Sequence, residues 1–387
     1  MKKVLFVSQS TNQEYVYMIS SALGCNVSMD VVTGSNVKPT DSVNIIACPS
    51  HDPRSMKSRL ICWIKHYFFI KKWIKNNKKN HYDLIFATSN PPINSYIGLK
   101  LKKAFNCPFI YMNWDLYPHV IEEAIKNPIA KFICGLWHKW NNKNYCKIDQ
   151  MITIADVVAE SINAKLTDKI DIDIIPIDEN IDTLKPVIKG NNKFAVENKL
   201  DDKFVILYSG KMGYGHNIEV ILEAAKKLSD YPDIKFVFIG KGPKRKLIEE
   251  HISNKVSDNV ILFDYQPAEV FPYSMACGDI GIVSQEESMA HLFMPSKTYS
   301  MMSCGEAIIG ICSNRDDLRN VIESNNIGYA VSGENVAEKI ADSILELYNN
   351  PDKLLQFKSN SRKTIENNYS TTIVTKKYSE LFEKVMK

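Results

Sequence analysis

Two kinds of pattern alternate along this chain. Short runs rich in Val, Ile and Phe predict buried strands, and longer stretches with apolar positions three and four apart predict helices between most of them. The predicted strands lie at 3–8, 29–33, 44–48, 83–88, 109–113, 150–154 and 172–177, and then at 204–209, 234–240, 260–263, 279–284 and 307–311. Because this alternation is typical of parallel sheets with helices on both faces, the pattern predicts an α/β fold.

The alternation occurs twice, on either side of a polar segment. Residues 178–203 are interrupted by proline and glycine and lack sustained periodicity, so they are predicted to form a linker. We therefore predict one Rossmann-like domain at 1–177 and a second at 204–365. A C-terminal helix is predicted at 366–387.

The bulk composition is that of a globular protein with two domains. The 387 residues are 45% hydrophobic and 24% charged. Nine cysteines include no C-x-x-C pair, which suggests reduced thiols in a cytoplasm. The apolar run in MKKVLFVSQS is shorter than a signal-peptide core, and no stretch has the length of a membrane span. The expected location is therefore cytoplasmic.

Basic residues are concentrated in the first half of the chain. Residues 1–175 carry 22 Lys and Arg against 14 Asp and Glu, whereas residues 176–387 carry 26 against 30. This asymmetry suggests an anionic partner for the N-terminal domain.

The stretch 54–79 is the most basic segment, with nine Lys and Arg and no acid. On a helix, one face collects the apolar and aromatic residues Met56, Leu60, Trp63, Tyr67, Ile70 and Ile74. Such a face beside lysines is typical of a helix that lies on anionic lipid. A helix that covers a sheet and leaves its basic side solvated explains the pattern equally well. A nucleic-acid interface is disfavoured, because the stretch reads as one helix and not as a basic groove.

Glycines follow the first predicted strand of the second half, in LYSGKMGYGHNIEV (207–220). Gly210 and Gly213 would let backbone N–H groups approach a phosphate at the start of the next helix. Lys211 and His216 flank this loop as cations or donors. The alternative is a tight turn that uses glycine only for its geometry.

Two further segments strengthen the phosphate hypothesis. Ser296 follows Pro295 as a candidate N-cap, and Lys297 falls in the first helical turn, where a cation fits if an anion is bound. The strand FIGKGP ends in a second glycine turn with Gly240 and Gly242. Three such helix starts after strands of one sheet indicate a nucleotide diphosphate site.

The order of these elements resembles the GT-B glycosyltransferases, specifically glycosyltransferase family 4 and its bacterial envelope-polysaccharide members. The resemblance covers nearly the whole chain and is strongest over 204–311. Gly210-Lys211 matches the G-R that holds the donor diphosphate, and His216 stands where the family has a lysine. A histidine there predicts that donor affinity depends on pH near neutrality.

Other parts of the donor site follow the family or depart from it. Gly240-Lys241-Gly242-Pro243 matches its G-x-G-P strand end, and Tyr265 lies in the loop that contacts the base in the family. The two glutamates usual in the donor loop are replaced by Leu292 and Ser300, and Pro295-Ser296-Lys297 forms a P-S-K variant. Glu286 and Glu287 are acids upstream of this variant that could approach the donor sugar or the ribose.

Candidate catalytic residues of the first half lie in FIYMNWDLYPHV (109–120). The family often has a His-Asp pair here, and this chain keeps Asp115 with Trp114 in the histidine position. Asp115 could accept a proton from an acceptor hydroxyl or orient the sugar, or it could simply cap a helix. His119 is a second candidate acid/base, with a structural role as the alternative.

The resemblance implies two Rossmann-like domains that face a central cleft, with the C-terminal helix crossing back to the N-terminal domain. It implies transfer of a sugar, with UDP-sugar as the favoured donor and with retention, to a polyprenyl-diphosphate-linked or saccharide acceptor of O-antigen or capsule biosynthesis. The implied place is the inner face of the cytoplasmic membrane, peripherally bound through 54–79. Neither a cofactor nor a metal is implied, and the acids of DID at 171–173 are explained by a strand. A hydrolysing nucleotide-sugar 2-epimerase and a non-catalytic sugar-nucleotide-binding scaffold remain alternatives.

Overall fold

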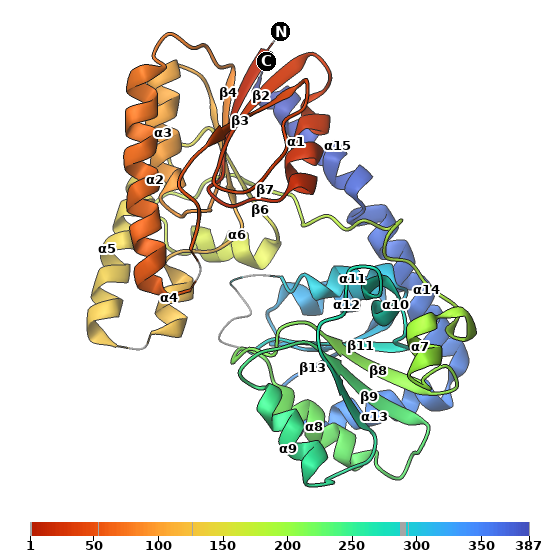
Figure 1. The fold of residues 1–387 in the computed structure, drawn as a ribbon. Helices are drawn as coiled ribbons and strands as arrows, with labels where there is room; N and C mark the ends of the chain where they lie inside the picture. Colours follow the sequence, from red (N-terminus) through yellow and green to blue (C-terminus); the bar gives the residue numbers. More distant parts are fainter. Residues whose placement is uncertain (1, 53, 126, 287–291, 293, 387) are drawn as a thin grey trace. The chain divides into compact units, whose positions relative to one another are not determined.

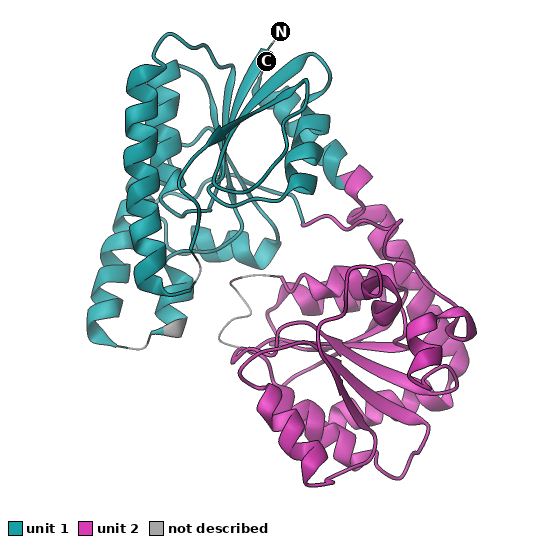
Figure 2. Ribbon diagram, viewed as in Figure 1, with its two compact units in different colours: residues 1–176, 374–387 teal, residues 177–373 magenta. Residues whose placement is uncertain are grey.

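The computed structural model describes residues 2–52, 54–125, 127–286, 292 and 294–386. It contains two compact units, drawn in different colours in Figure 2. Unit 1 comprises residues 1–176 and 374–387, and unit 2 comprises residues 177–373. Each unit is built around its own parallel sheet.

Unit 1 contains a seven-stranded parallel sheet. In spatial order its strands are β3 (Val43–Ala47), β2 (Val27–Thr33), β1 (Lys2–Val7), β4 (Leu84–Thr88), β5 (Phe109–Asn113), β6 (Gln150–Thr153) and β7 (Ile172–Ile174). The register places Val4 of β1 opposite Met29 of β2 and Leu84 of β4, and all three side chains are buried. The short apolar runs form strands here because both faces of the sheet are covered.

Helices cover this sheet from two sides (Figure 1). α2, α3 and α5 lie on one side, and α1 and α15 lie on the other. The helices of unit 1, together with α15, are α1 (Gln13–Leu23), α2 (Met56–Asn76), α3 (Asn94–Phe105), α4 (His119–Ala124), α5 (Pro128–Tyr145), α6 (Asp156–Asn163) and α15 (Thr371–Val385). None of the helices in the described residues is both long enough and apolar enough to traverse a bilayer.

The basic helix α2 has two apolar faces. Trp63 and Ile70 are buried, so the face predicted to meet lipid turns partly inward and that expectation is wrong for these two residues. Ile61, Ile64 and Phe68 are instead 44%, 48% and 59% exposed. The helix therefore covers the sheet and still presents apolar side chains to solvent.

The end of the chain packs on the sheet that its beginning forms. The Tyr378 hydroxyl of α15 lies 3.0 Å from that of Tyr15 in α1, and the Phe382 ring is 5.5 Å from the ring of Phe86 in β4. Residues 374–387 accordingly belong to unit 1. The expected crossing of the C-terminal helix to the N-terminal domain is confirmed.

Unit 2 contains a six-stranded parallel sheet. Its strands, in spatial order, are β10 (Val260–Phe263), β9 (Ile234–Ile239), β8 (Phe204–Ser209), β11 (Ile280–Ser284), β12 (Ala307–Ile311) and β13 (Gly328–Val331). Its helices are η1 (Lys189–Asn191), α7 (Lys193–Glu197), α8 (Ile218–Lys227), α9 (Arg245–Ser253), α10 (Phe271–Met275), α11 (Lys297–Ser303), α12 (Asp317–Asn325), α13 (Val336–Asn349) and α14 (Pro351–Asn368).

The helical spacing of apolar residues explains how these helices join the core. In α13 the residues Ala337, Ile340, Ala341, Ile344 and Leu347 are buried, and they recur every three or four positions. They pack with the strands of unit 2 in one apolar cluster.

Every predicted strand is present, and the structure adds β13. Only four residues long, β13 begins at Gly328, where a Cβ would overlap the carbonyl oxygen of Ile308. A run this short, opened by glycine, carries too little apolar pattern to be recognised in the sequence.

Candidate functional site

Two glycine loops meet at the carboxyl edge of the unit 2 sheet, where β8 and β9 end side by side. Gly210 and Gly240 have φ angles of +130° and +143°, and a Cβ on Gly240 would overlap the carbonyl oxygen of Gly210. The Gly210 N–H donates to Ile239 O at 2.8 Å, and the Met212 N–H donates to Lys241 O at 2.9 Å. The loops are therefore held backbone against backbone, which only glycine permits.

This first loop presents backbone donors. Within the described residues, the N–H groups of Lys211, Gly213, Tyr214 and Gly215 donate no hydrogen bond. Free N–H groups at the start of a helix are what an anion needs, because the helix end adds positive potential. The loop thus has the form of an anion site.

The Lys297 side chain reaches the same loop from α11. Its Nζ is inaccessible to solvent, has no hydrogen-bond partner among the described residues, and lies 3.9 Å from the centre of the Tyr208 ring. It is also 3.4 Å from the position that a Cβ on Gly210 would occupy. Burial lowers the pKa of Lys297 to about 7. Lys297 is therefore poised to be charged when an anion occupies the loop.

Ser296 precedes α11 but does not cap it. Its backbone is helical, with φ −60° and ψ −29°, and its side chain makes no capping hydrogen bond. Ser296 therefore holds the predicted N-cap position, but without the predicted capping hydrogen bond, since a capping residue needs an extended backbone to aim its hydroxyl at the helix. Pro295 beside it is buried, and its carbonyl accepts from the Thr298 N–H at 3.0 Å.

The surroundings of His216 favour its neutral form. Its Nδ1 lies 2.7 Å from the carbonyl oxygen of Ser284, so Nδ1 carries the proton and Nε2 is left as an acceptor. Burial, together with the charge of Lys297, lowers the pKa of His216 to about 4. The expectation that His216 titrates near neutrality is therefore wrong, and the group with a pKa of about 7 is Lys297.

Two further basic residues, which were not predicted from the sequence, hold these loops in place by hydrogen bonds. Lys244 Nζ donates to His216 O at 2.7 Å and to a Glu219 oxygen at 3.0 Å. Arg245 Nη1 donates to Gly240 O at 2.7 Å and pairs with Asp264 at 2.9 Å. The sequence does contain a signal for Lys244 and Arg245, because both directly follow the second glycine turn.

The remaining donor-site candidates lie around these loops or outside the description. The Glu286 N–H donates to Gly215 O at 3.1 Å, and its carboxylate is 3.7 Å from Lys244 Nζ. Tyr265 is 52% exposed and lies 3.4 Å from the position of a Cβ on Gly240. Lys211 is exposed on the first loop. Glu287 lies outside the described residues.

In unit 1, Asp115 follows the end of β5. Its N–H donates to Ser89 Oγ at 3.1 Å, and the residue is reached by solvent although protein lies close around its carboxylate. Asp115 caps no helix, because α4 begins at His119 with Pro118 in the N-cap position. Desolvation by the surrounding protein raises the pKa of Asp115, and the positive charges of Arg59 and His51 oppose that rise.

His119 has a different environment. The residue is 6% exposed, and its ring packs edge-on against His138 with centroids 4.6 Å apart. The His138 Nε2 in turn lies 3.0 Å from a Glu122 oxygen. These contacts favour the structural interpretation of His119.

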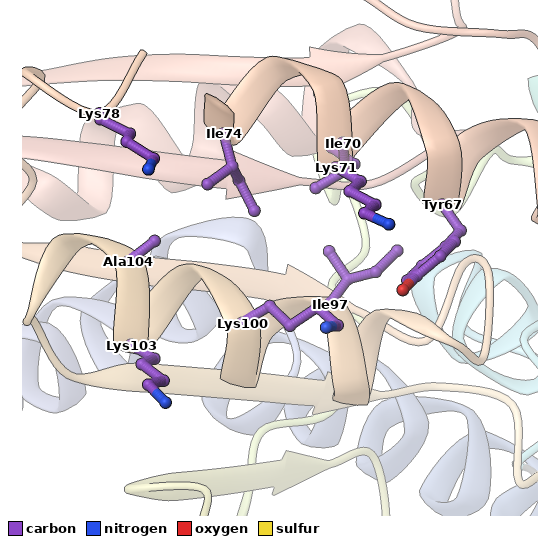
Figure 3. Close-up of a pocket in the computed structure, with 9 residues that line it drawn as sticks. All are labelled: Tyr67, Ile70, Lys71, Ile74, Lys78, Ile97, Lys100, Lys103 and Ala104. Carbon is purple, nitrogen blue, oxygen red and sulfur yellow. The ribbon is translucent and has the colours of Figure 1, made fainter. Parts of the chain in front are cut away.

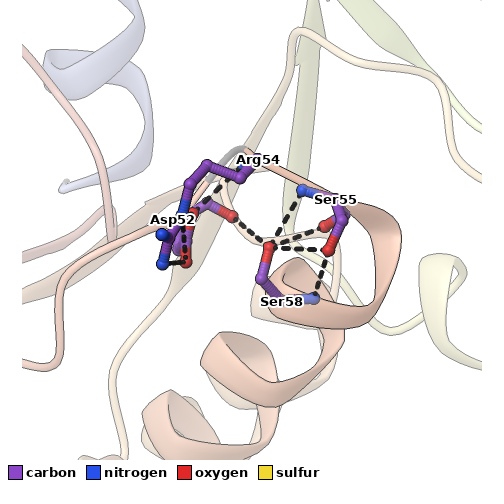
Figure 4. Close-up of polar contacts among 4 residues, drawn as sticks. All are labelled: Asp52, Arg54, Ser55 and Ser58. Atoms are coloured by element: carbon purple, nitrogen blue, oxygen red, sulfur yellow. Dashed lines mark hydrogen bonds and ion pairs between the residues drawn. The ribbon is translucent and has the colours of Figure 1, made fainter.

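Side chains of neighbouring residues cap the beginning of α2, the helix that contains Arg59. Ser55 and Ser58 bond reciprocally at the beginning of α2, and Arg54 makes three side-chain hydrogen bonds with Asp52 (Figure 4). This arrangement orients the first turn of α2, from which Arg59 acts on the Asp115 carboxylate.

No metal-binding cluster of three or more His, Cys, Asp or Glu side chains is found in the part of the chain that the structure describes. Asp173 of the DID sequence lies in β7 and is 3.8 Å from Lys384 Nζ.

The chain is similar to known glycosyltransferases. Residues 190–364 match the family described as glycosyl transferases group 1. WcaI of Escherichia coli, described as a colanic acid biosynthesis glycosyl transferase, is 28% identical over 151 residues, which cover 38% of this chain and 37% of WcaI. WbjE of Pseudomonas aeruginosa, described as a glycosyltransferase, is 22% identical over 334 residues, which cover 84% of this chain and 82% of WbjE. The structure of Anabaena HepE in complex with UDP-glucose aligns with a TM-score of 0.71 and 12% identity, covering 99% of this chain and 100% of HepE.

Proposed function

We propose that this chain is a GT-B glycosyltransferase that moves a hexosyl or N-acetylhexosaminyl group from a nucleotide-diphosphate sugar to a lipid-linked or saccharide acceptor. The acceptor belongs to cell-envelope polysaccharide biosynthesis, such as O-antigen or capsule. A relative described as acting in colanic acid biosynthesis supports this setting. A UDP-sugar is the favoured donor, because HepE, which shares the fold, is seen with UDP-glucose.

The observation that carries the proposal is the position of Lys297. A buried ammonium group without a hydrogen-bond partner among the described residues is costly, unless an anion binds beside it. Lys297 Nζ lies 3.4 Å from the position of a Cβ on Gly210, and Gly210 begins the loop whose N–H groups donate no hydrogen bond within the described residues. A sugar-nucleotide diphosphate matches this combination of one buried cation and several backbone donors.

In the proposed reaction the nucleoside diphosphate departs as the acceptor hydroxyl attacks the anomeric carbon. Lys297, Lys211 and the loop N–H groups stabilise the negative charge that develops on the departing diphosphate. Attack from the face that the diphosphate leaves gives retention without a covalent intermediate on the protein. Asp115 accepts the hydroxyl proton or orients the sugar, and its raised pKa suits a proton acceptor. Neither a cofactor nor a metal takes part in this scheme.

We further propose that unit 1 associates peripherally with the inner face of the cytoplasmic membrane. The support is α2, which carries no acidic residue and exposes Ile61, Ile64 and Phe68 beside its lysines. A lipid-linked acceptor is presented at such a surface.

The function is tested by incubating the purified full chain with UDP-, GDP- and dTDP-sugars and a polyprenyl-diphosphate-linked sugar acceptor. We expect nucleotide release with at least one pair, with a UDP-sugar foremost. If no pair releases nucleotide, the proposed reaction is wrong for the donors and acceptors of the panel. Lys211→Ala should weaken donor binding, whereas Lys226→Ala, which removes an exposed lysine from the last turn of α8, should not.

A further inference from the structure

A basic groove runs between α2 and α3 on the outer side of unit 1. Its volume is about 550 Å³, and Ile70, Ile74 and Ile97 form its apolar floor. Lysines from both helices line it, together with Tyr67. Figure 3 shows the Lys71 and Lys100 ammonium groups and the Tyr67 hydroxyl around the same end of the groove.

The lysines of this groove have no acidic partner among the described residues. Within the described part of the chain, Lys71, Lys78, Lys100 and Lys103 form no ion pair, and no acidic residue lines the groove. Lys100 Nζ lies 4.7 Å from the centre of the Tyr96 ring, a contact that orients it without neutralising it. By contrast, Lys102 on the same helix pairs with Asp149 at 2.7 Å.

The neighbouring helices share the basic and apolar composition of the groove. The sequences of α2, α3 and α5 contain no Asp or Glu. α5 packs against α2 through Trp137 and Trp63, whose ring centres are 6.3 Å apart. Beside this contact, Ile129, Phe132 and Ile133 of α5 are 74%, 68% and 54% exposed. Exposed apolar side chains next to unpaired lysines complement an anionic lipid surface.

We infer that the groove between α2 and α3 binds the phosphate headgroup of an anionic phospholipid, while exposed apolar residues of α2 and α5 enter the membrane surface beside it. The lysines pair with the phosphate, and the isoleucine floor contacts the glycerol and the first acyl carbons. This inference rests on the proposed membrane association and not on the proposed transfer reaction.

The test measures co-sedimentation of the full chain with phosphatidylcholine vesicles that contain or lack phosphatidylglycerol. The double variant Lys71→Gln/Lys100→Gln should lose about tenfold in affinity for the anionic vesicles, because each lysine that meets the surface contributes to binding. The matched control is Lys165→Gln/Lys169→Gln, which removes the same charge from exposed positions of unit 1 between α6 and β7, outside the groove and outside α2 and α5. This control should lose clearly less affinity for the anionic vesicles than the groove variant loses.

Equal losses in the two double variants would overturn the groove site, since they would show attraction to overall charge alone. Wild-type affinity in the groove variant would overturn it as well. Tryptophan fluorescence during unfolding checks that unit 1 is intact in each variant. Nucleotide release with a detergent-dispersed acceptor separates the two proposals. Its absence in the wild type contradicts the transfer reaction and leaves the vesicle result unaffected.

Discussion

Lys297 ends in surroundings that suit a charged group poorly. Its Nζ has the Tyr208 ring at 3.9 Å and no hydrogen-bond acceptor among the described residues. The pKa of about 7 follows from this burial. His216, which holds its Nδ1 proton against Ser284 O, stays neutral over the same pH range.

The affinity for a UDP-sugar should therefore depend on pH through Lys297. It should be nearly constant below about pH 7 and then fall by as much as about tenfold per pH unit. The sign follows because the anionic diphosphate favours the charged lysine, so binding must take up a proton wherever free Lys297 is neutral. Calorimetric titration at several pH values measures this slope.

Two variants show which residue causes this pH dependence of donor affinity. Lys297→Met should lower the affinity about tenfold or more below pH 7, because it removes a charged donor, and should abolish the slope. His216→Gln should keep the slope. The assignment is contradicted if the slope survives in the first variant and disappears in the second.

Glu306, between α11 and β12, is a second buried ionisable group. It is 0% exposed, and neither carboxyl oxygen has a hydrogen-bond partner among the residues that the structure describes. Gly278 and Gly281 leave room for it, since a Cβ on either would lie within 3 Å of Glu306 Oε2. Burial raises the pKa of Glu306 well above its ordinary value, so the folded protein keeps this acid protonated.

Glu306→Gln should increase the relative stability of unit 2 as pH rises. Above about pH 4.5 the unfolded wild type releases the Glu306 proton and the folded form retains it, so wild-type stability declines by up to about 1.4 kcal/mol per pH unit. The glutamine variant lacks this loss. The measurement is denaturant-dependent labelling of Cys312, a buried thiol of unit 2, between about pH 5 and about pH 8. Parallel pH curves for the two proteins would refute the assignment.

At the scale of elements, the donor site depends on the ends of parallel strands. β8 and β9 bring two loops together that are some thirty residues apart in sequence, as Gly210 and Gly240 show. Parallel strands end at the same edge of their sheet, so each strand delivers its following loop to one place. Arg245 then holds the carbonyl groups of Gly240 and Phe263 at 2.7 and 3.2 Å.

Gly240→Ala should therefore destabilise unit 2 by at least about 2 kcal/mol, since it combines a positive φ with an overlap on backbone oxygen. Cys312 labelling in denaturant measures the change. Gly190→Ala serves as the control, because a Cβ at Gly190 has no heavy atom within 4 Å. Equal stability of the two variants would show that the loops can separate without cost.

At the scale of the whole molecule, unit 1 is completed by the last residues of the chain. Val374, Tyr378, Leu381 and Phe382 of α15 are buried. All five tryptophans lie in unit 1, so their fluorescence reports on that unit alone. The cysteines Cys277, Cys304 and Cys312 are buried in unit 2 and report on the other.

Phe382→Ala should destabilise unit 1 by about 3–5 kcal/mol, because it empties a fully packed aromatic site against Phe86. The tryptophan transition should move to lower denaturant while Cys312 labelling stays unchanged. Glu383→Ala, at the next and exposed position of α15, should leave both transitions in place. An unchanged tryptophan transition in Phe382→Ala would show that α15 is dispensable for unit 1.

Much of the architecture was predictable from the sequence alone. The periods of apolar residues identified every strand except β13, and the succession of strands and helices identified two parallel sheets. The two glycine loops were predicted to form one site, and they lie in contact. The reason is that neighbouring parallel strands end at the same edge of the sheet. These features depend on local pattern and chain order, which the sequence contains directly.

Only the tertiary structure decided which face of α2 is buried and how Lys297 and His216 are protonated. The α2 sequence has two apolar faces, and only packing showed that Trp63 turns inward while Phe68 remains exposed. The pKa values of Lys297 and His216 depend on neighbours from distant strands, which no local pattern records. Ionisation and side-chain direction are set by the environment that the assembled fold creates around each group, and that environment exists only after segments far apart in sequence have met.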